Sequence, residues 1–180
     1  NYVDGERNGK GKEYYKNGDL EYDGDFIKGK REGKGKYIYE DGSYYIGDWL
    51  DDSEHGKGKV YLKNGHLEYD GDFIMGKKEG KGKYIYDDGD YYIGEFLNDE
   101  INGKGKIFLV NGELECEGDF VNGKMEGTGK YIYDDGDFYE GEWQNDEQHG
   151  KGKIFYKNGG LKYDGDFVNV KKEGKGKFIY

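Results

Sequence analysis

Apolar and polar residues alternate along short stretches of this chain, and the stretches recur at regular intervals. Residues 22–26 read Tyr-Asp-Gly-Asp-Phe, which places two aromatic residues and a glycine on one side of an extended strand and two aspartates on the other. Residues 33–39 alternate in the same way after a connection of six residues. A period of two residues is typical of a strand with one buried face, whereas a helix would repeat roughly every 3.6 residues. We therefore predict that each pair of such stretches forms a β-hairpin.

Turn-forming dipeptides separate one predicted hairpin from the next. They are Asp-Gly at 41–42, 88–89 and 135–136, and Asn-Gly at 64–65, 111–112 and 158–159. Both dipeptides favour tight turns between antiparallel strands. If like positions pair across a hairpin, Asp23 and Asp25 lie opposite Lys34 and Lys36, in ion pairs that contribute roughly 0.2–1 kcal/mol each. The same pairing puts glycines beside aromatic rings on the other face, where the rings cover the exposed backbone.

A motif of the form aromatic-x-Gly-acid-aromatic marks each repeat. Its copies begin at Tyr22, Tyr45, Tyr69, Tyr92, Cys116, Tyr139 and Tyr163, at intervals that alternate between 23 and 24 residues. The extra residue of the longer interval predicts a β-bulge in every second repeat. The repeats are expected at 22–44, 45–68, 69–91, 92–115, 116–138 and 139–162, with a partial repeat at 1–21 and a truncated one at 163–180. Since both ends fall inside repeats, we expect residues 1–180 to be one continuous array that is a segment of a longer array or of a larger protein.

These features predict an all-β fold, an elongated, twisted, single-layer antiparallel meander of stacked β-hairpins. The composition agrees with this prediction, because Gly supplies 35 and Tyr 20 of the 180 residues while Ala and Pro are absent, which argues against a helical protein. The single cysteine, Cys116, excludes an internal disulfide. No apolar run approaches the roughly 18 residues that mark a transmembrane helix.

Two stretches carry a motif that resembles a known repeat family. Residues 139–143, Tyr-Glu-Gly-Glu-Trp, are followed by His-Gly-Lys-Gly at 149–152, and this pattern resembles the MORN (membrane occupation and recognition nexus) repeat. Residues 45–49 and 55–58 carry the same pattern, and the resemblance covers essentially the whole chain. Cys116 and the Asn102-Gly103 pair depart from the pattern. The resemblance implies a curved sheet with an aromatic-lined groove. It also implies a role as a protein-binding scaffold, a cytoskeletal or ciliary component, a phospholipid-binding module or a regulatory segment of an enzyme.

The polar residues do not form a recognisable catalytic or metal site. Most carboxylates have a copy 47 residues away in an equivalent environment, whereas acid–base catalysis needs two carboxylates in different environments. His55 and His149 lie at equivalent tips, and no Cys/His spacing suggests zinc. The Gly-Thr-Gly-Lys sequence at 127–130 lacks the spacing of a phosphate-binding loop, and no EF-hand spacing follows the aspartate-rich turns. We therefore predict that the chain is not an enzyme and binds no metal or cofactor.

Charge alternates along the predicted hairpin tips. Tips of one repeat type are basic and those of the other are acidic, so neighbouring tips should attract each other, although salt screens part of this attraction. The candidate charged edge consists of Lys30, Arg31, Asp51, Asp52, Lys77, Lys78, Asp99, Glu100, Lys171 and Lys172. Because acidic tips flank each basic one and the net charge is −11, we expect no nucleic-acid partner, and membrane lipid is disfavoured.

Aromatic residues recur on one face of the predicted sheet. A single layer cannot bury both faces, so part of this surface should form an open groove, and exposed apolar patches mark interaction sites. The candidate groove residues are Tyr45, Trp49, Tyr69, Phe73, Tyr92, Phe96, Tyr139 and Trp143. We predict a non-catalytic scaffold that binds a helix or an extended peptide of a partner protein in this groove.

Three other interpretations stay open at this point. The chain is a phospholipid head-group or membrane-junction module, a glycan-binding array of stacked aromatic residues, or the regulatory arm of a larger enzyme. Unpaired strands at the ends offer a route to self-association. We expect a cytoplasmic location, and the resemblance implies the cytoskeleton or a cilium.

Overall fold

The computed structural model describes residues 2–3 and 5–178, and every regular element among them is a β-strand. The chain divides into two compact units, Asn1–Ile85 with Leu97–Asp99 and Tyr86–Phe96 with Glu100–Tyr180. The first unit contains β1 (Tyr2–Val3), β2 (Glu6–Arg7), β3 (Gly9–Tyr14), β4 (Leu20–Ile27), β5 (Lys30–Ile38), β6 (Tyr44–Leu50), β7 (Ser53–Tyr61), β8 (Leu67–Ile74) and β9 (Lys77–Ile85). The second contains β10 (Tyr91–Leu97) except its last residue, β11 (Glu100–Phe108), β12 (Leu114–Val121), β13 (Lys124–Ile132), β14 (Phe138–Gln144), β15 (Glu147–Phe155), β16 (Leu161–Val168) and β17 (Lys171–Phe178).

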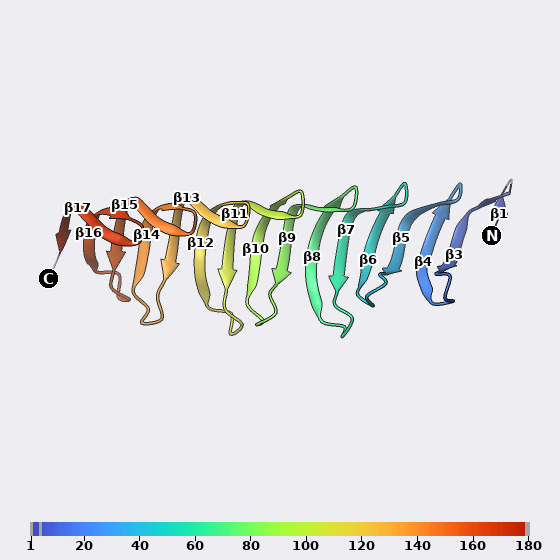
Figure 1. Cartoon of the computed structure of the whole chain (residues 1–180), viewed down its shortest axis with the longest axis horizontal. Coiled ribbons are helices and arrows are strands. Elements are labelled where there is room, and N and C mark those ends of the chain that lie inside the picture. Colours follow the sequence, from blue (N-terminus) through green and yellow to red (C-terminus); the bar gives the residue numbers. More distant parts are fainter. Residues whose placement is uncertain (1, 4, 179–180) are drawn as a thin grey trace. The chain divides into compact units, whose positions relative to one another are not determined.

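The strands of each unit lie in chain order (Figure 1). From β3 to β9, and again from β11 to β17, each strand pairs antiparallel with the next one. The short strands β1 and β2 form a separate two-stranded sheet. The prediction of an all-β array of consecutive antiparallel hairpins is confirmed.

The hairpin tips are tighter than the sequence suggested. Only Lys28 and Gly29 separate β4 from β5, and their φ angles are 49° and 80°. Positive φ at both central residues is the geometry of a type I′ turn, whose twist matches that of the paired strands. The expected connection of six residues is therefore wrong, because the strands continue to the turn. The Asp-Gly dipeptide lies in a wider turn at the other end of the hairpin, where the Gly42 N–H donates to the Tyr39 carbonyl oxygen at 2.9 Å.

The register within the β4–β5 hairpin follows the prediction only in part. Asp23 lies opposite Lys36, but Asp25 lies opposite Glu32 rather than Lys34. The strand β5 bulges at this point, and the backbone N–H of Lys34 donates to the Asp25 carboxylate at 3.2 Å. Asp25 makes its ion pair with a lysine of β3 instead, at 2.9 Å. Because of the bulge, Asp25 forms its ion pair with the preceding hairpin and not with the other strand of its own hairpin.

A second bulge explains the alternation between 23 and 24 residues. Tyr69 pairs with Val60 and Leu67 pairs with Tyr61, which leaves Glu68 as an extra residue in β8. The same shift occurs where β4, β12 and β16 pair with their preceding strands. One extra residue restores the facing of the side chains that follow it, so aromatic residues of both repeat types share one face. The predicted bulge is confirmed.

Each tyrosine of the repeat motif covers a pair of glycines on neighbouring strands. Tyr69 lies over Gly71 and Gly82, and a methyl group added to Gly82 would lie 2.5 Å from a carbon of the Tyr69 ring. The Tyr69 ring also meets Phe73 edge to face, with centroids 5.2 Å apart, and Tyr45 of the preceding hairpin meets Phe73 at 5.0 Å. The core of each unit is therefore a series of rings that link neighbouring hairpins above glycine backbone.

Candidate interaction surfaces

The predicted groove residues lie inside this core. Their exposed fractions are 0% for Tyr45, Tyr69, Tyr92 and Tyr139, 3% for Phe73, 5% for Trp49 and Phe96, and 7% for Trp143. The rings of each repeat cover those of the preceding one, as Trp49 does when it meets Tyr22 edge to face at 5.1 Å. These residues hold the hairpins together, and their contact with a partner stays a prediction. Strand periodicity identified their common face, but it carries no information on the coverage of that face by neighbouring hairpins.

The phenols of Tyr45 and Tyr92 and the thiol of Cys116 are uncharged at neutral pH. Burial raises the pKa of the Tyr92 hydroxyl to about 12, and it raises the pKa of the Cys116 thiol to about 12. The Tyr45 hydroxyl, whose pKa burial also raises, donates to the Asp48 carbonyl oxygen at 2.9 Å. A neutral phenol or thiol is a weak base and a weak nucleophile, so these groups serve packing and hydrogen bonding.

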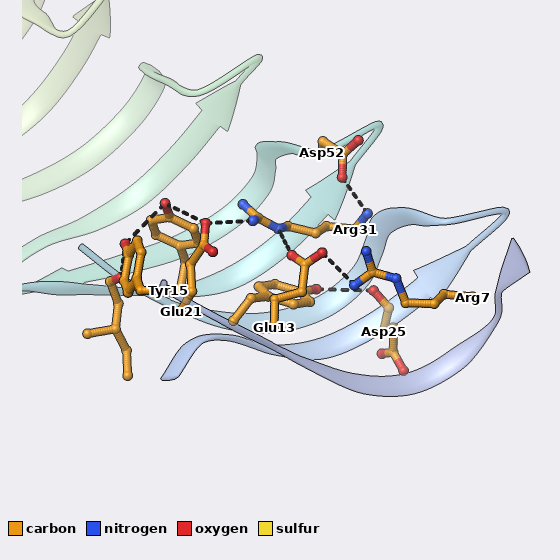
Figure 2. Close-up of polar contacts among 10 residues, drawn as sticks. Arg7, Glu13, Tyr15, Glu21, Asp25, Arg31 and Asp52 are labelled. Atoms are coloured by element: carbon orange, nitrogen blue, oxygen red, sulfur yellow. Dashed lines mark hydrogen bonds and ion pairs between the residues drawn. The ribbon is translucent and has the colours of Figure 1, made fainter. Parts of the chain in front are cut away.

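Arg31 was expected on the charged edge, but the structure places its guanidinium over the rings. The side chain is 18% exposed, and it donates to Glu13 at 2.8 Å and to Glu21 at 3.0 Å (Figure 2). Its guanidinium carbon lies 4.7 Å from the centroid of the Tyr37 ring and 5.2 Å from that of Tyr22. Glu21 is the extra residue of the β4 bulge, which turns its carboxylate toward this cluster. Lys78 and Lys172 take the equivalent place over the rings of their own repeats.

Most of the remaining edge residues join neighbouring hairpin tips. Lys30 pairs with Asp51 of the next tip at 2.7 Å. The Asp52 carboxylate accepts the backbone N–H of Arg31 at 2.7 Å, while the Asp52 N–H donates to the Arg31 carbonyl oxygen at 3.1 Å. Asp99 makes the same two contacts with the backbone of Lys78, and Lys77 donates to Asn98 at 3.1 Å. Glu100 and Lys171 lie exposed beside their tips. Opposite charges at adjacent tips therefore contribute to the junction between hairpins as well as to the surface.

An exposed apolar residue, which the alternation of polar and apolar positions did not predict, precedes each tip turn in the first unit. Ile27 is 56%, Leu50 40%, Ile74 52% and Leu97 51% exposed, and we call these four side chains the tip row. Each directly follows a buried ring in its strand, so it points away from the core. In the second unit Val121 and Val168 hold the same position, at 50% and 45% exposed. The signal was present in the sequence as an apolar residue after the last aromatic residue of six of the seven motif copies.

A shallow groove runs over the glycines on the face opposite the rings. In the first unit it has a volume of about 570 Å³ and is lined by Lys34, Lys36, Ile46, Lys59 and Asp70, among others. Lys59 pairs with Asp70 at 2.5 Å, and Lys34 pairs with an aspartate of β6. The second unit carries a groove of the same kind, of about 560 Å³. Lysines and carboxylates alternate along both grooves, so they lack the field of one sign that a polyanion would need.

No metal centre is assembled by the described part of the chain, since no three or more His, Cys, Asp or Glu side chains converge there. His55 and His149 lie opposite Asp48 and Glu142 within their hairpins. Over residues 2–3 and 5–178 there is also no helix long and apolar enough to cross a membrane.

Comparison with known families gives a match along the whole chain. The model of the MORN repeat matches eight times, at residues 1–20, 22–44, 45–67, 69–91, 92–113, 116–138, 139–161 and 163–180. A search of curated proteins gives no match. MORN repeats are generally non-enzymatic and generally mediate protein or membrane interactions. The eight matches agree with the hairpins that the structure shows, and the chain belongs to the MORN repeat family.

Proposed function

We propose that this chain is a non-catalytic scaffold that binds an amphipathic helix of a partner protein along the tip row. The single observation that supports this most strongly is the tip row itself, one exposed aliphatic side chain on each of four successive hairpins. Regularly spaced apolar side chains that face solvent are a feature of interaction surfaces. The buried rings then support the surface from beneath, and the cytoplasm is its proposed location.

The spacing of the tip row suits a helix. Successive members of the row are two strands apart, which corresponds to roughly 9.6 Å. An α-helix advances about 10.5 Å in seven residues, so a partner helix with an apolar residue at every seventh position meets the row in register. Lys30 and Asp51 beside the row supply charges of both signs, which favour a helix with mixed charges on its flanks.

Phospholipid is the second candidate, because MORN repeats also mediate membrane interactions. Anionic membranes attract clusters of four to eight basic residues, at about 1 kcal/mol for each residue near the surface. In the tip region Lys30 is neutralised by Asp51, and the net charge of the chain is −11. Charge therefore favours a protein partner over an anionic membrane.

The proposal is tested by binding from an extract of the source cells to three forms of the chain. Leu50→Asp/Ile74→Asp places charges in the tip row, whereas Ile46→Asp places one in the groove over the glycines, at a position of β6 that is 43% exposed and lies four residues before Leu50 on the same face. We expect one protein to bind the native chain and Ile46→Asp, and to be lost from the double variant. Equal binding to all three forms would contradict the proposal. The proposal would also be contradicted if the chain bound vesicles of phosphatidylcholine and phosphatidylserine and no protein in the extract distinguished the variants.

A further inference from the structure

One repeat lacks the tyrosine that covers its glycines. Six motif copies begin with a tyrosine, namely Tyr22, Tyr45, Tyr69, Tyr92, Tyr139 and Tyr163, and each is at most 3% exposed. Each of these hydroxyl groups donates to the backbone carbonyl three residues further on, at 2.8–3.4 Å. The seventh copy has Cys116 in this place, although both of its glycines, Gly118 and Gly129, are retained. The site for a phenol ring is thus preserved without the ring.

Met125 occupies part of the space that the missing ring leaves. A methyl group added to Gly129 would lie 2.5 Å from the terminal carbon of Met125, the same distance that separates a methyl on Gly82 from the Tyr69 ring. Met125 stands at the position of Arg31 and Lys78, whose charged groups lie over the faces of ring-bearing repeats. Methionine is unbranched and changes rotamer at low cost. The Met125 side chain can therefore move to the position that Lys78 takes over its ring, and leave the space above Gly129 to a bound ring.

A cavity of about 380 Å³ adjoins this space. It is lined by Cys116, Phe120, Met125, Tyr131, Trp143 and Gln148, among others. The Trp143 indole N–H, in a side chain only 7% exposed, has no hydrogen-bond partner among the described residues. The equivalent N–H of Trp49, in a repeat that has its tyrosine, donates to a backbone carbonyl at 3.4 Å. An aromatic ring that carries an oxygen fits such a cavity, because the ring packs against the apolar wall and the oxygen accepts a hydrogen bond from the buried indole N–H.

We propose that this cavity binds a small neutral aromatic molecule of the phenol class, which takes the place of the absent tyrosine ring. The six tyrosines define the shape of the ligand, because the same pair of glycines accepts a phenol ring in each of their repeats. Glu115 and Asp146 also line the cavity, and their carboxylates select against an anionic ring such as a benzoate. This site is independent of the tip row, and neither proposal depends on the other.

The test is a titration with 4-methylphenol, the side-chain analogue of tyrosine, followed by NMR of the two tryptophan indole N–H groups. Trp143 lines the cavity, whereas Trp49 belongs to the first unit and serves as an internal control. We expect a saturable shift of the Trp143 signal with a dissociation constant on the order of 1 mM, as befits a ligand of eight heavy atoms. The Trp49 signal should not move, and 4-methylbenzoate should have no effect.

Two variants make the test decisive. Met125→Ala removes the side chain that the ligand must displace, and it should tighten binding by about tenfold. Cys116→Tyr supplies the ring from the chain itself and should abolish binding. The absence of a saturable Trp143 shift in both the native chain and Met125→Ala would overturn the proposal. Binding that persists in folded Cys116→Tyr would overturn it as well, because the ligand would then occupy another place.

Discussion

Substitution of a single glycine beneath a ring should destabilise the first unit strongly. Gly47 of β6 lies between Gly35 and Gly58 on the neighbouring strands. In Gly47→Ala the new methyl group would lie 2.6 Å from the Gly58 Cα, and closer still to the hydroxyl and ring of Tyr45. Neither the central backbone nor the fully buried ring can move without disturbing a neighbouring hairpin. Overpacking of this kind costs about 1–3 kcal/mol, and loss of the Tyr45 hydroxyl bond adds about 1 kcal/mol, so we expect a total of about 3 kcal/mol.

The assay is urea unfolding followed by the fluorescence of Trp49, whose ring centroid lies 5.5 Å from that of Tyr45. A Trp143→Phe background removes the signal of the second tryptophan. Gly11→Ala is the matched control, because its methyl group meets only the edge of the Phe26 ring, at 3.0 and 3.1 Å. The control should cost less than about 1 kcal/mol. If Gly47→Ala costs no more than Gly11→Ala, the tyrosine does not lie on the glycine backbone and the description of the core is wrong.

Two further predictions concern the polar groups that border the rings. Arg31→Ala removes the cation that bridges Glu13 and Glu21, leaves Glu13 with Arg7 alone, and should cost about 2–3 kcal/mol in urea unfolding, whereas Arg31→Lys should cost less than half as much. Equal costs would show that the guanidinium geometry is irrelevant. Burial raises the pKa of Glu54, so the folded chain binds the carboxyl proton more tightly than the unfolded chain does. The protonated carboxyl therefore stabilises the folded chain below the unfolded pKa near 4.5, and this stabilisation is lost as pH rises through the folded pKa. Glu54→Gln keeps an acceptor for the Tyr39 hydroxyl, so the variant should be more stable than the native chain at pH 8 and equal to it at pH 4, as thermal unfolding at both pH values can check. A variant that is less stable at pH 8 would contradict the assignment.

The hairpins could be predicted because their determinants are local. Alternation over five to seven residues fixes the faces of each strand, and the extra residue before Tyr69 fixes the position of its bulge. The bulge opposite Asp25 was missed because it depends on a glycine with φ of 67° at position 33 and on the capping of a backbone N–H by the carboxylate. Tip turns such as Asp51-Asp52 were missed for a similar reason, since two aspartates at positive φ are an uncommon sequence for a type I′ turn.

The candidate site was harder to predict, because exposure depends on neighbouring hairpins. The periodicity placed Tyr45 and Trp49 on one face, but it did not show that the next repeat covers them. Arg31 was taken for an edge charge because its sequence neighbours are basic, whereas two glutamates draw it over the rings. Leu50 was overlooked because a single apolar residue beside a turn has no periodicity of its own.

The most direct test of the proposed scaffold is photocrosslinking to its partner from two positions of the first unit. Benzoylphenylalanine at position 50 places the crosslinker in the tip row, and at position 37 it replaces the half-buried Tyr37 on the ring face. After irradiation in an extract of the source cells, we expect one protein to be crosslinked from position 50 and not from position 37. A crosslink from position 37 alone would contradict the assignment of the tip row and would favour an aromatic groove as the binding surface.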